Sequence, residues 1–155
     1  MKRKVMLLCF CVACLIFMVA YFVPLRPVVT ITNNTGKVMY IYAGESIYGV
    51  EPEPDEVVEI VKSKPDILAS GKELKLTASF MSLIRKDAAI DIGWRIGGQY
   101  EYNSTGGGGQ NFLLSSSEGA CSVSIKIQDG VNKAILDNDS GDVCLKKIKA
   151  FQYTY

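Results

Sequence analysis

Hydrophobic and polar residues alternate along most of the chain beyond residue 28, a period of two that is typical of strands with one buried face. The alternation is clearest at residues 74–80, 90–95 and 121–128, where apolar side chains occupy every second position. Clusters of Gly, Pro, Asn and Asp separate these segments and predict turns. Beyond residue 25, the sequence offers only short candidates for helix, at residues 79–86 or 64–70.

Some of the turn clusters predict β-hairpins. Residues 33–36 separate an alternating run from a second β-rich run at 37–42, and Asp129 with Gly130 forms a tight turn before Val131. The four glycines at 106–109 predict a mobile loop at a hairpin tip. The pattern therefore predicts an all-β fold, a single β-sandwich or small barrel of about seven to nine short antiparallel strands.

The N-terminal part of the chain follows a different pattern. Residues 5–25 contain no charged residue and no glycine, and they follow Lys2, Arg3 and Lys4. A helix of this length spans about 31 Å, close to the hydrocarbon thickness of a bilayer. We expect one transmembrane helix over residues 5–25 that contacts the lipid bilayer, with the basic residues 1–4 on the cytoplasmic side.

Two other fates of this segment are open. Cleavage by a signal peptidase after Ala20 would place Met18, which is not small, three positions before the cut. Lipidation of Cys14 would require the following chain to leave the membrane, yet residues 15–23 are as apolar as those before them. An uncleaved signal anchor fits the sequence better than either alternative.

The remaining residues, 28–155, are enough for one domain with its own core. The anchor would place this domain outside the cytoplasm, in the periplasm or the extracellular space. Four of the 17 Lys and Arg residues precede position 28, which leaves 13 basic against 16 acidic side chains, a net charge of −3. Because nucleic-acid binding requires a basic surface, we expect no nucleic-acid partner.

Five cysteines divide between the two parts of the chain. Cys121 and Cys144 lie in the outward domain, where an oxidising compartment favours a disulfide between them. Cys9, Cys11 and Cys14 lie in the apolar segment, where they serve as small hydrophobic residues or, for Cys9, as an acylation site.

Acidic residues gather between positions 45 and 59, with no Lys or Arg among them. Two prolines, Pro52 and Pro54, predict that the central part of this run is an extended loop. An uncompensated acidic surface favours a basic protein partner through steering and selectivity. The candidate partner-binding residues are Glu51, Glu53, Asp55, Glu56 and Glu59.

Catalytic and metal-binding patterns are missing from the sequence. The chain has no histidine, which excludes histidine-dependent triads and histidine-ligated zinc. Catalytic carboxylates need a partly desolvated pocket, which an exposed acidic loop does not supply. The run at 137–142 resembles a calcium loop but lacks its glycine at the sixth position and glutamate at the twelfth. We therefore expect no enzyme, no cofactor and no metal site.

The layout as a whole favours a non-enzymatic, protein-binding module anchored in the inner (cell) membrane. An immunity-type protein that blocks an envelope-acting toxin would have this layout, although layout alone is an analogy. One alternative is a structural or accessory subunit of an envelope or secretion complex. A second is a small hydrolase that depends on paired carboxylates.

Overall fold

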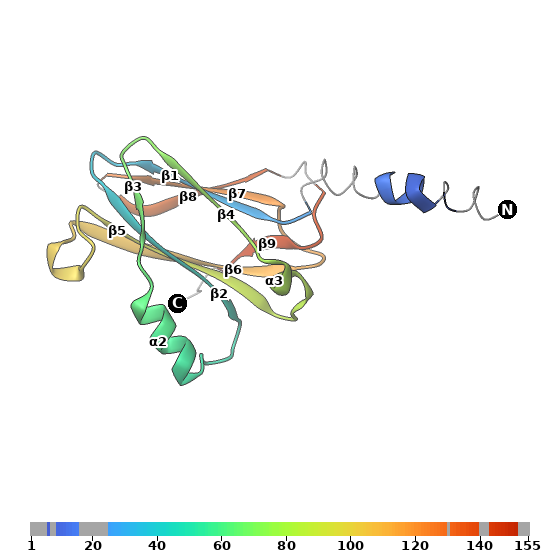
Figure 1. The fold of residues 1–155 in the computed structure, drawn as a ribbon. Helices are drawn as coiled ribbons and strands as arrows, with labels where there is room; N and C mark the ends of the chain where they lie inside the picture. The colour runs from blue at the N-terminus through green and yellow to red at the C-terminus, as the bar shows by residue number, and fades with distance from the viewer. Residues whose placement is uncertain (1–5, 7–8, 16–24, 130, 140–142, 152–155) are drawn as a thin grey trace.

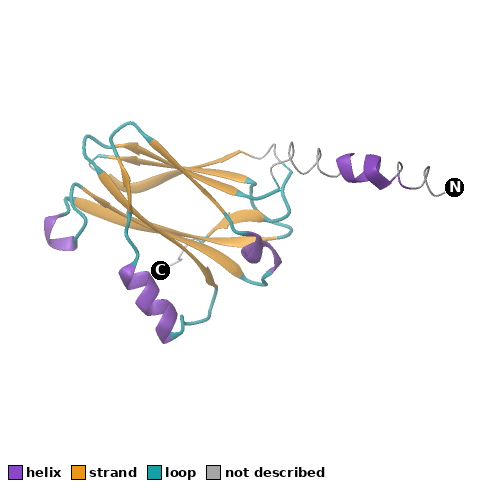
Figure 2. Cartoon of the chain, in the orientation of Figure 1, coloured by secondary structure: helices purple, strands orange, loops and turns teal. Residues whose placement is uncertain are grey.

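The structure is a computed structural model that describes residues 6, 9–15, 25–129, 131–139 and 143–151. Within these residues, two β-sheets pack face to face as a sandwich (Figures 1 and 2). The expectation of an all-β fold with seven to nine strands is confirmed, since the described part of the chain contains nine.

Each sheet takes strands from distant parts of the sequence. The four-stranded sheet has the order β4-β1-β7-β8, and the five-stranded sheet the order β3-β2-β5-β6-β9. The strands of the first sheet are β1 (Val28–Asn34), β4 (Glu73–Thr77), β7 (Ser122–Gln128) and β8 (Val131–Asp139). Those of the second are β2 (Met39–Ile47), β3 (Asp66–Leu68), β5 (Ala88–Ile96), β6 (Gly106–Ser115) and β9 (Lys147–Ala150).

Three short helical elements lie in the connections. They are α2 (Pro54–Lys62), α3 (Phe80–Ile84) and the single-turn helix η1 (Glu101–Asn103). The helix expected within residues 79–86 is confirmed as α3, whereas the alternative at 64–70 is wrong because this stretch contains β3.

The alternating apolar positions of the strands form one core between the sheets. The buried side chains include Val29 and Ile31 of β1, Ile90 and Trp94 of β5, and Phe112 of β6. Polar residues at the intervening positions of β1, β5 and β7 are less buried, as a period of two requires. The pattern in the sequence therefore identified the inward face of these strands.

The hairpin expected at residues 33–36 is wrong, because this turn carries the chain from one sheet to the other. β1 pairs with β4 and β7, whereas β2 pairs with β3 and β5. The side chain of Asn33 is buried and fixes the crossing: its amide nitrogen donates to the carbonyls of Lys37 and Leu68, each at 2.9 Å. Its oxygen accepts from the backbone N–H and the hydroxyl of Thr35.

The expectation that all strands are antiparallel is also wrong at one pair. β1 and β7 are parallel, with Val28 opposite Ser122 and Asn34 opposite Gln128. Parallel neighbours need a long crossover, and here the chain between them builds β4 and most of the second sheet. The hairpin expected around Asp129 is confirmed by the antiparallel pairing of β7 with β8.

The four glycines at 106–109, expected to form a mobile tip, instead lie within β6 and pair with β5. Trp94 of β5 faces Gly108 and lies against its backbone, so a strand without side chains is needed at this point. Residues 97–105, which include η1, make the turn between β5 and β6.

The expected disulfide between Cys121 and Cys144 is confirmed, with Cα atoms 5.7 Å apart. Cys121 directly precedes β7, and its carbonyl accepts a hydrogen bond from the N–H of Val28 at 2.9 Å. Cys144 lies shortly before β9. The bond therefore links the beginnings of β1 and β7 to the segment that enters the other sheet.

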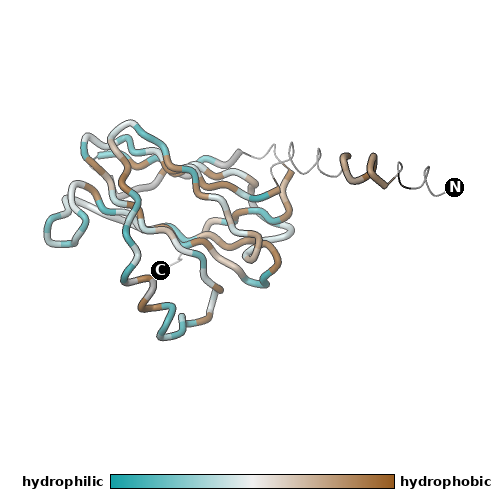
Figure 3. The backbone as a smooth tube through the Cα atoms, in the orientation of Figure 1, coloured by the Kyte–Doolittle hydropathy of each residue, from teal (hydrophilic) through white to brown (hydrophobic). Residues whose placement is uncertain are grey.

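The described N-terminal residues are few. Residues 9–15 are helical and largely hydrophobic (Figure 3), and Cys9, Cys11 and Cys14 are exposed free thiols. Among the described residues, no helix has the length and hydrophobicity to span a membrane. Most of the predicted anchor at residues 5–25 lies outside the described residues, so the anchor stays a prediction.

Candidate partner-binding surface

The acidic run was expected to form an extended loop around Pro52 and Pro54, but its second half, from Pro54, belongs to the α-helix α2. The residues at the start and end of α2 explain why a helix forms here. Pro54 is the first helical residue, where a missing N–H is harmless and the fixed φ suits a helix. The carboxylate of Glu56 accepts from the N–H of Glu53 at 3.1 Å, which satisfies a donor at the helix start. Asp55 and Glu56 in the first turn and Lys62 in the last complement the helix dipole.

α2 is amphipathic, and its described apolar side chains are exposed. Val57, Val58 and Ile60 are 43%, 47% and 61% exposed, and every other side chain described in this helix is exposed as well. Figure 1 shows α2 standing away from the two sheets, and Figure 3 shows hydrophobic and hydrophilic residues mixed along it. Because a helix of this length gains most of its stability from packing, an unpacked apolar side is unusual.

The predicted partner-binding residues all lie in or beside α2. Glu51 is in the connection from β2, Glu53 directly precedes the helix, and Asp55 and Glu56 are in its first turn. All four are exposed, and none forms an ion pair with a Lys or Arg of the described residues. Glu59 belongs to α2, but its side chain lies outside the described part of the structure.

Glu45, the remaining acidic residue of this run, has a structural role elsewhere. Its carboxylate accepts from the N–H and the hydroxyl of Ser79, both at 2.5 Å, and from the hydroxyl of Ser82 at 2.7 Å. Desolvation raises the pKa of Glu45, but these hydrogen bonds and the charge of Arg85 outweigh it, so the pKa is lowered. Glu45 thus joins the end of β2 to the start of α3.

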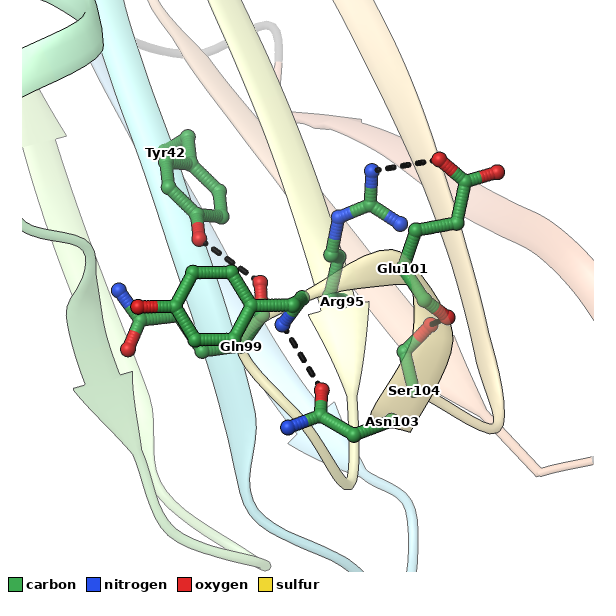
Figure 4. A network of polar contacts seen from close by, with 7 residues as sticks. Tyr42, Arg95, Gln99, Glu101, Asn103 and Ser104 are labelled. Carbon is green, nitrogen blue, oxygen red and sulfur yellow. Dashed lines mark hydrogen bonds and ion pairs between the residues drawn. The ribbon is translucent and has the colours of Figure 1, made fainter.

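A second exposed feature is the turn between β5 and β6. Tyr100 and Tyr102 stack with ring centroids 5.5 Å apart and are 52% and 85% exposed. Figure 4 shows the polar contacts that order this turn. The hydroxyl of Tyr42 donates to the carbonyl of Gln99 at 2.9 Å, and the N–H of Tyr100 donates to the side chain of Asn103 at 2.9 Å.

The ion pair in Figure 4 adds to the order of this aromatic turn. Arg95 of β5 lies 3.7 Å from the carboxylate of Glu101, and the hydroxyl of Ser104 donates to the carbonyl of Glu101. This turn, rather than residues 106–109, is the exposed tip of the β5–β6 connection.

The calcium-like run at 137–142 is described only in part. Asp137 lies in β8, where its carboxylate is 3.6 Å from the ammonium of Lys126 on β7. Residues 140–142 lie outside the described residues. Among those that are described, no group of three His, Cys, Asp or Glu side chains could hold a metal ion.

The exposed apolar residues of α2 and the stacked pair Tyr100 and Tyr102 were not predicted from the sequence. The apolar residues of α2 do carry a signal in the sequence, because Val57, Ile60 and Val61 follow a helical spacing. Pro54 is the helix start that accompanies this spacing, although proline within a run is also a sign of a loop. Tyr102 carries no signal of its own, because its exposure depends on how the turn folds.

Comparison with models of protein families, with curated proteins and with solved structures found no match to this chain. The candidate surface is an acidic, amphipathic helix whose described apolar side chains are exposed.

Proposed function

We propose that this protein is a non-enzymatic binding module that captures a protein partner through α2. The membrane anchor at residues 5–25 would hold the domain at the outer face of the inner membrane. An immunity-type inhibitor of an envelope-acting toxin is one protein of this kind.

The observation that carries the proposal is the exposure of the described apolar side chains of α2. Val57, Val58 and Ile60 are exposed on a helix that also carries Asp55 and Glu56, which form no ion pair among the described residues. A partner with an apolar groove and a basic rim would cover both, as in helix-in-groove recognition. The apolar contacts would supply affinity, and the acidic side chains would steer association in a salt-dependent way.

A hydrolase is less well supported by this geometry. Glu51, Glu53, Asp55 and Glu56 are all exposed, whereas a catalytic pair needs a setting that separates the two pKa values. These residues are therefore better suited to binding a protein than to catalysing a reaction.

Charge reversal tests the proposal. We expect Glu51→Lys with Asp55→Lys to reduce capture of the partner from an envelope extract by at least tenfold, with an unchanged unfolding transition. The matched control is Asp66→Lys with Glu73→Lys, which reverses two exposed acidic residues that form no ion pair among the described residues. Equal capture by both double variants, at low and moderate salt, would place the binding surface outside α2.

A further inference from the structure

A second exposed apolar surface lies on α3 and the segment before β9. Phe80, Met81 and Ile84 occupy one side of α3 and are 63%, 55% and 78% exposed. Val143 and Leu145 of the neighbouring segment are 73% and 59% exposed. We call these five residues the apolar end. Surfaces of this kind on soluble domains mark contacts with proteins or membranes.

The apolar end is fixed to the residue at which the predicted anchor stops. The N–H of Leu145 donates to the carbonyl of Leu25 at 3.1 Å, and the guanidinium of Arg26 lies 4.9 Å from the ring centre of Phe80. The ammonium of Lys146 donates to the carbonyls of Ser82 and Arg85 and so joins this segment to α3. Figure 1 shows α3 at the end of the sandwich where β1 begins.

The charge around the apolar end is mainly basic. Four basic residues lie next to it, either as neighbours in the sequence or in direct contact: Arg26, Arg85, Lys86 and Lys146. Among the described residues, two acidic side chains lie nearby: Glu45 accepts hydrogen bonds from Ser79 and Ser82, and Asp87 is 4.0 Å from the ammonium of Lys86. Asp142, which precedes Val143 in the sequence, lies outside the described residues. Apolar side chains with a basic rim are the composition of surfaces that lie in the interface of an anionic bilayer.

We propose that the apolar end seats the domain on the surface of an anionic phospholipid bilayer. Phe80, Met81 and Ile84 enter the boundary between headgroups and acyl chains, and Arg85 and Lys86 contact lipid phosphates. The occupant is a bilayer rather than a protein because Leu25, the last residue of the membrane-length apolar segment, contacts this surface directly. The inference rests on the proposed anchor and adds an orientation to it.

This seating would leave η1 at the far end of the domain, opposite α3 (Figure 2). The acidic helix α2 would be repelled by the same anionic surface that attracts Arg85 and Lys86. A bilayer-bound domain would therefore keep α2 available to a partner.

Quenching of tryptophan fluorescence by brominated lipids tests the seating in the full chain. The variants are Phe80→Trp and Ile84→Trp on the apolar end, and Tyr102→Trp on η1 as the matched control. Trp94 is 4% exposed and gives the same background in each. The proteins are reconstituted in vesicles of phosphatidylcholine and phosphatidylglycerol that contain a lipid brominated near the headgroup.

We expect the added tryptophan at 80 or 84 to be quenched at least twofold more than that at 102. Replacing phosphatidylglycerol by phosphatidylcholine, or Arg85 and Lys86 by Gln, should reduce this difference. Equal quenching at all three positions, in vesicles that retain the protein after a carbonate wash, would overturn the seating while leaving the anchor intact. Release of the protein by carbonate would overturn both the seating and the anchor. The capture experiment with the α2 variants does not depend on the seating or on the anchor.

Discussion

The indole ring of Trp94 occupies the space that a side chain at Gly108 would need. A Cβ atom built on Gly108 would lie 2.6 Å from Cζ2 and 2.9 Å from Cε2 of the ring. A Cβ on Gly107 would lie 2.8 Å from the carbonyl oxygen of Trp94. Glycine at positions 107 and 108 is therefore required for the packing of Trp94, the single tryptophan in the chain.

Gly108→Ala should destabilise the domain by about 1–3 kcal/mol, because the indole must move out of its place in the core. Urea unfolding of the purified protein measures the change. Gly44→Ala is the control, since a Cβ at this position of β2 meets no atom within 4 Å. The same loss in both variants would mean that glycine matters here through backbone conformation alone.

Loss of the disulfide should lower the free energy of unfolding of the oxidised protein more than Gly108→Ala does. Cys121→Ser or Cys144→Ser removes a bond that closes a sequence separation of 23 residues, and we expect a loss of about 2–4 kcal/mol. Reduced wild-type protein should then unfold at nearly the same denaturant concentration as the variants. Two thiols that react with an alkylating agent in denatured, unreduced protein would contradict the bond.

The lowered pKa of Glu45 predicts a loss of stability in acid. Because the folded state binds the proton less tightly than the unfolded state, this contribution is present above the ordinary value of 4.5 and disappears as the pH falls through the lower, folded pKa. Glu45→Gln should cost about 1 kcal/mol at neutral pH, a small value because the carboxylate is exposed. Thermal unfolding between pH 3 and 7 should show a shallower acid dependence in this variant, and an identical dependence would exclude Glu45 as its source.

The sequence alone predicted the strands whose apolar and polar residues alternate. It did not predict features that depend on pairing between residues distant in sequence. Residues 90–95 show the inward face of β5 because apolar side chains recur at every second position. The turn at 33–36 has ordinary hairpin composition, and only the buried contacts of Asn33 with Lys37 and Leu68 turn the chain into the other sheet. No local pattern could show this.

The candidate surface was predicted in part. Its acidic residues were found because charge is visible in the sequence, whereas its helical form was missed at Pro54. The apolar end depends on the contact of Leu145 with Leu25 and on that of Phe80 with Arg26, which join residues distant in sequence that share no motif.

The anchor predicts that the mature protein keeps its N-terminus. Mass spectrometry of the intact, membrane-extracted protein should give the mass of a chain that still contains residues 5–25. A species that begins near Tyr21 would indicate a cleaved signal, and one that begins at a modified Cys14 would indicate a lipoprotein.

Partner capture through α2 is the central claim, and site-specific photo-crosslinking in cells tests it most directly. A photoreactive residue is placed at Val58 of α2 or at Tyr102 of η1, both of which are exposed. We predict one discrete crosslinked product from position 58 that is lost with Glu51→Lys and Asp55→Lys, and none from position 102. A discrete product from position 102, with none from position 58, would contradict the account and assign the partner to the aromatic turn.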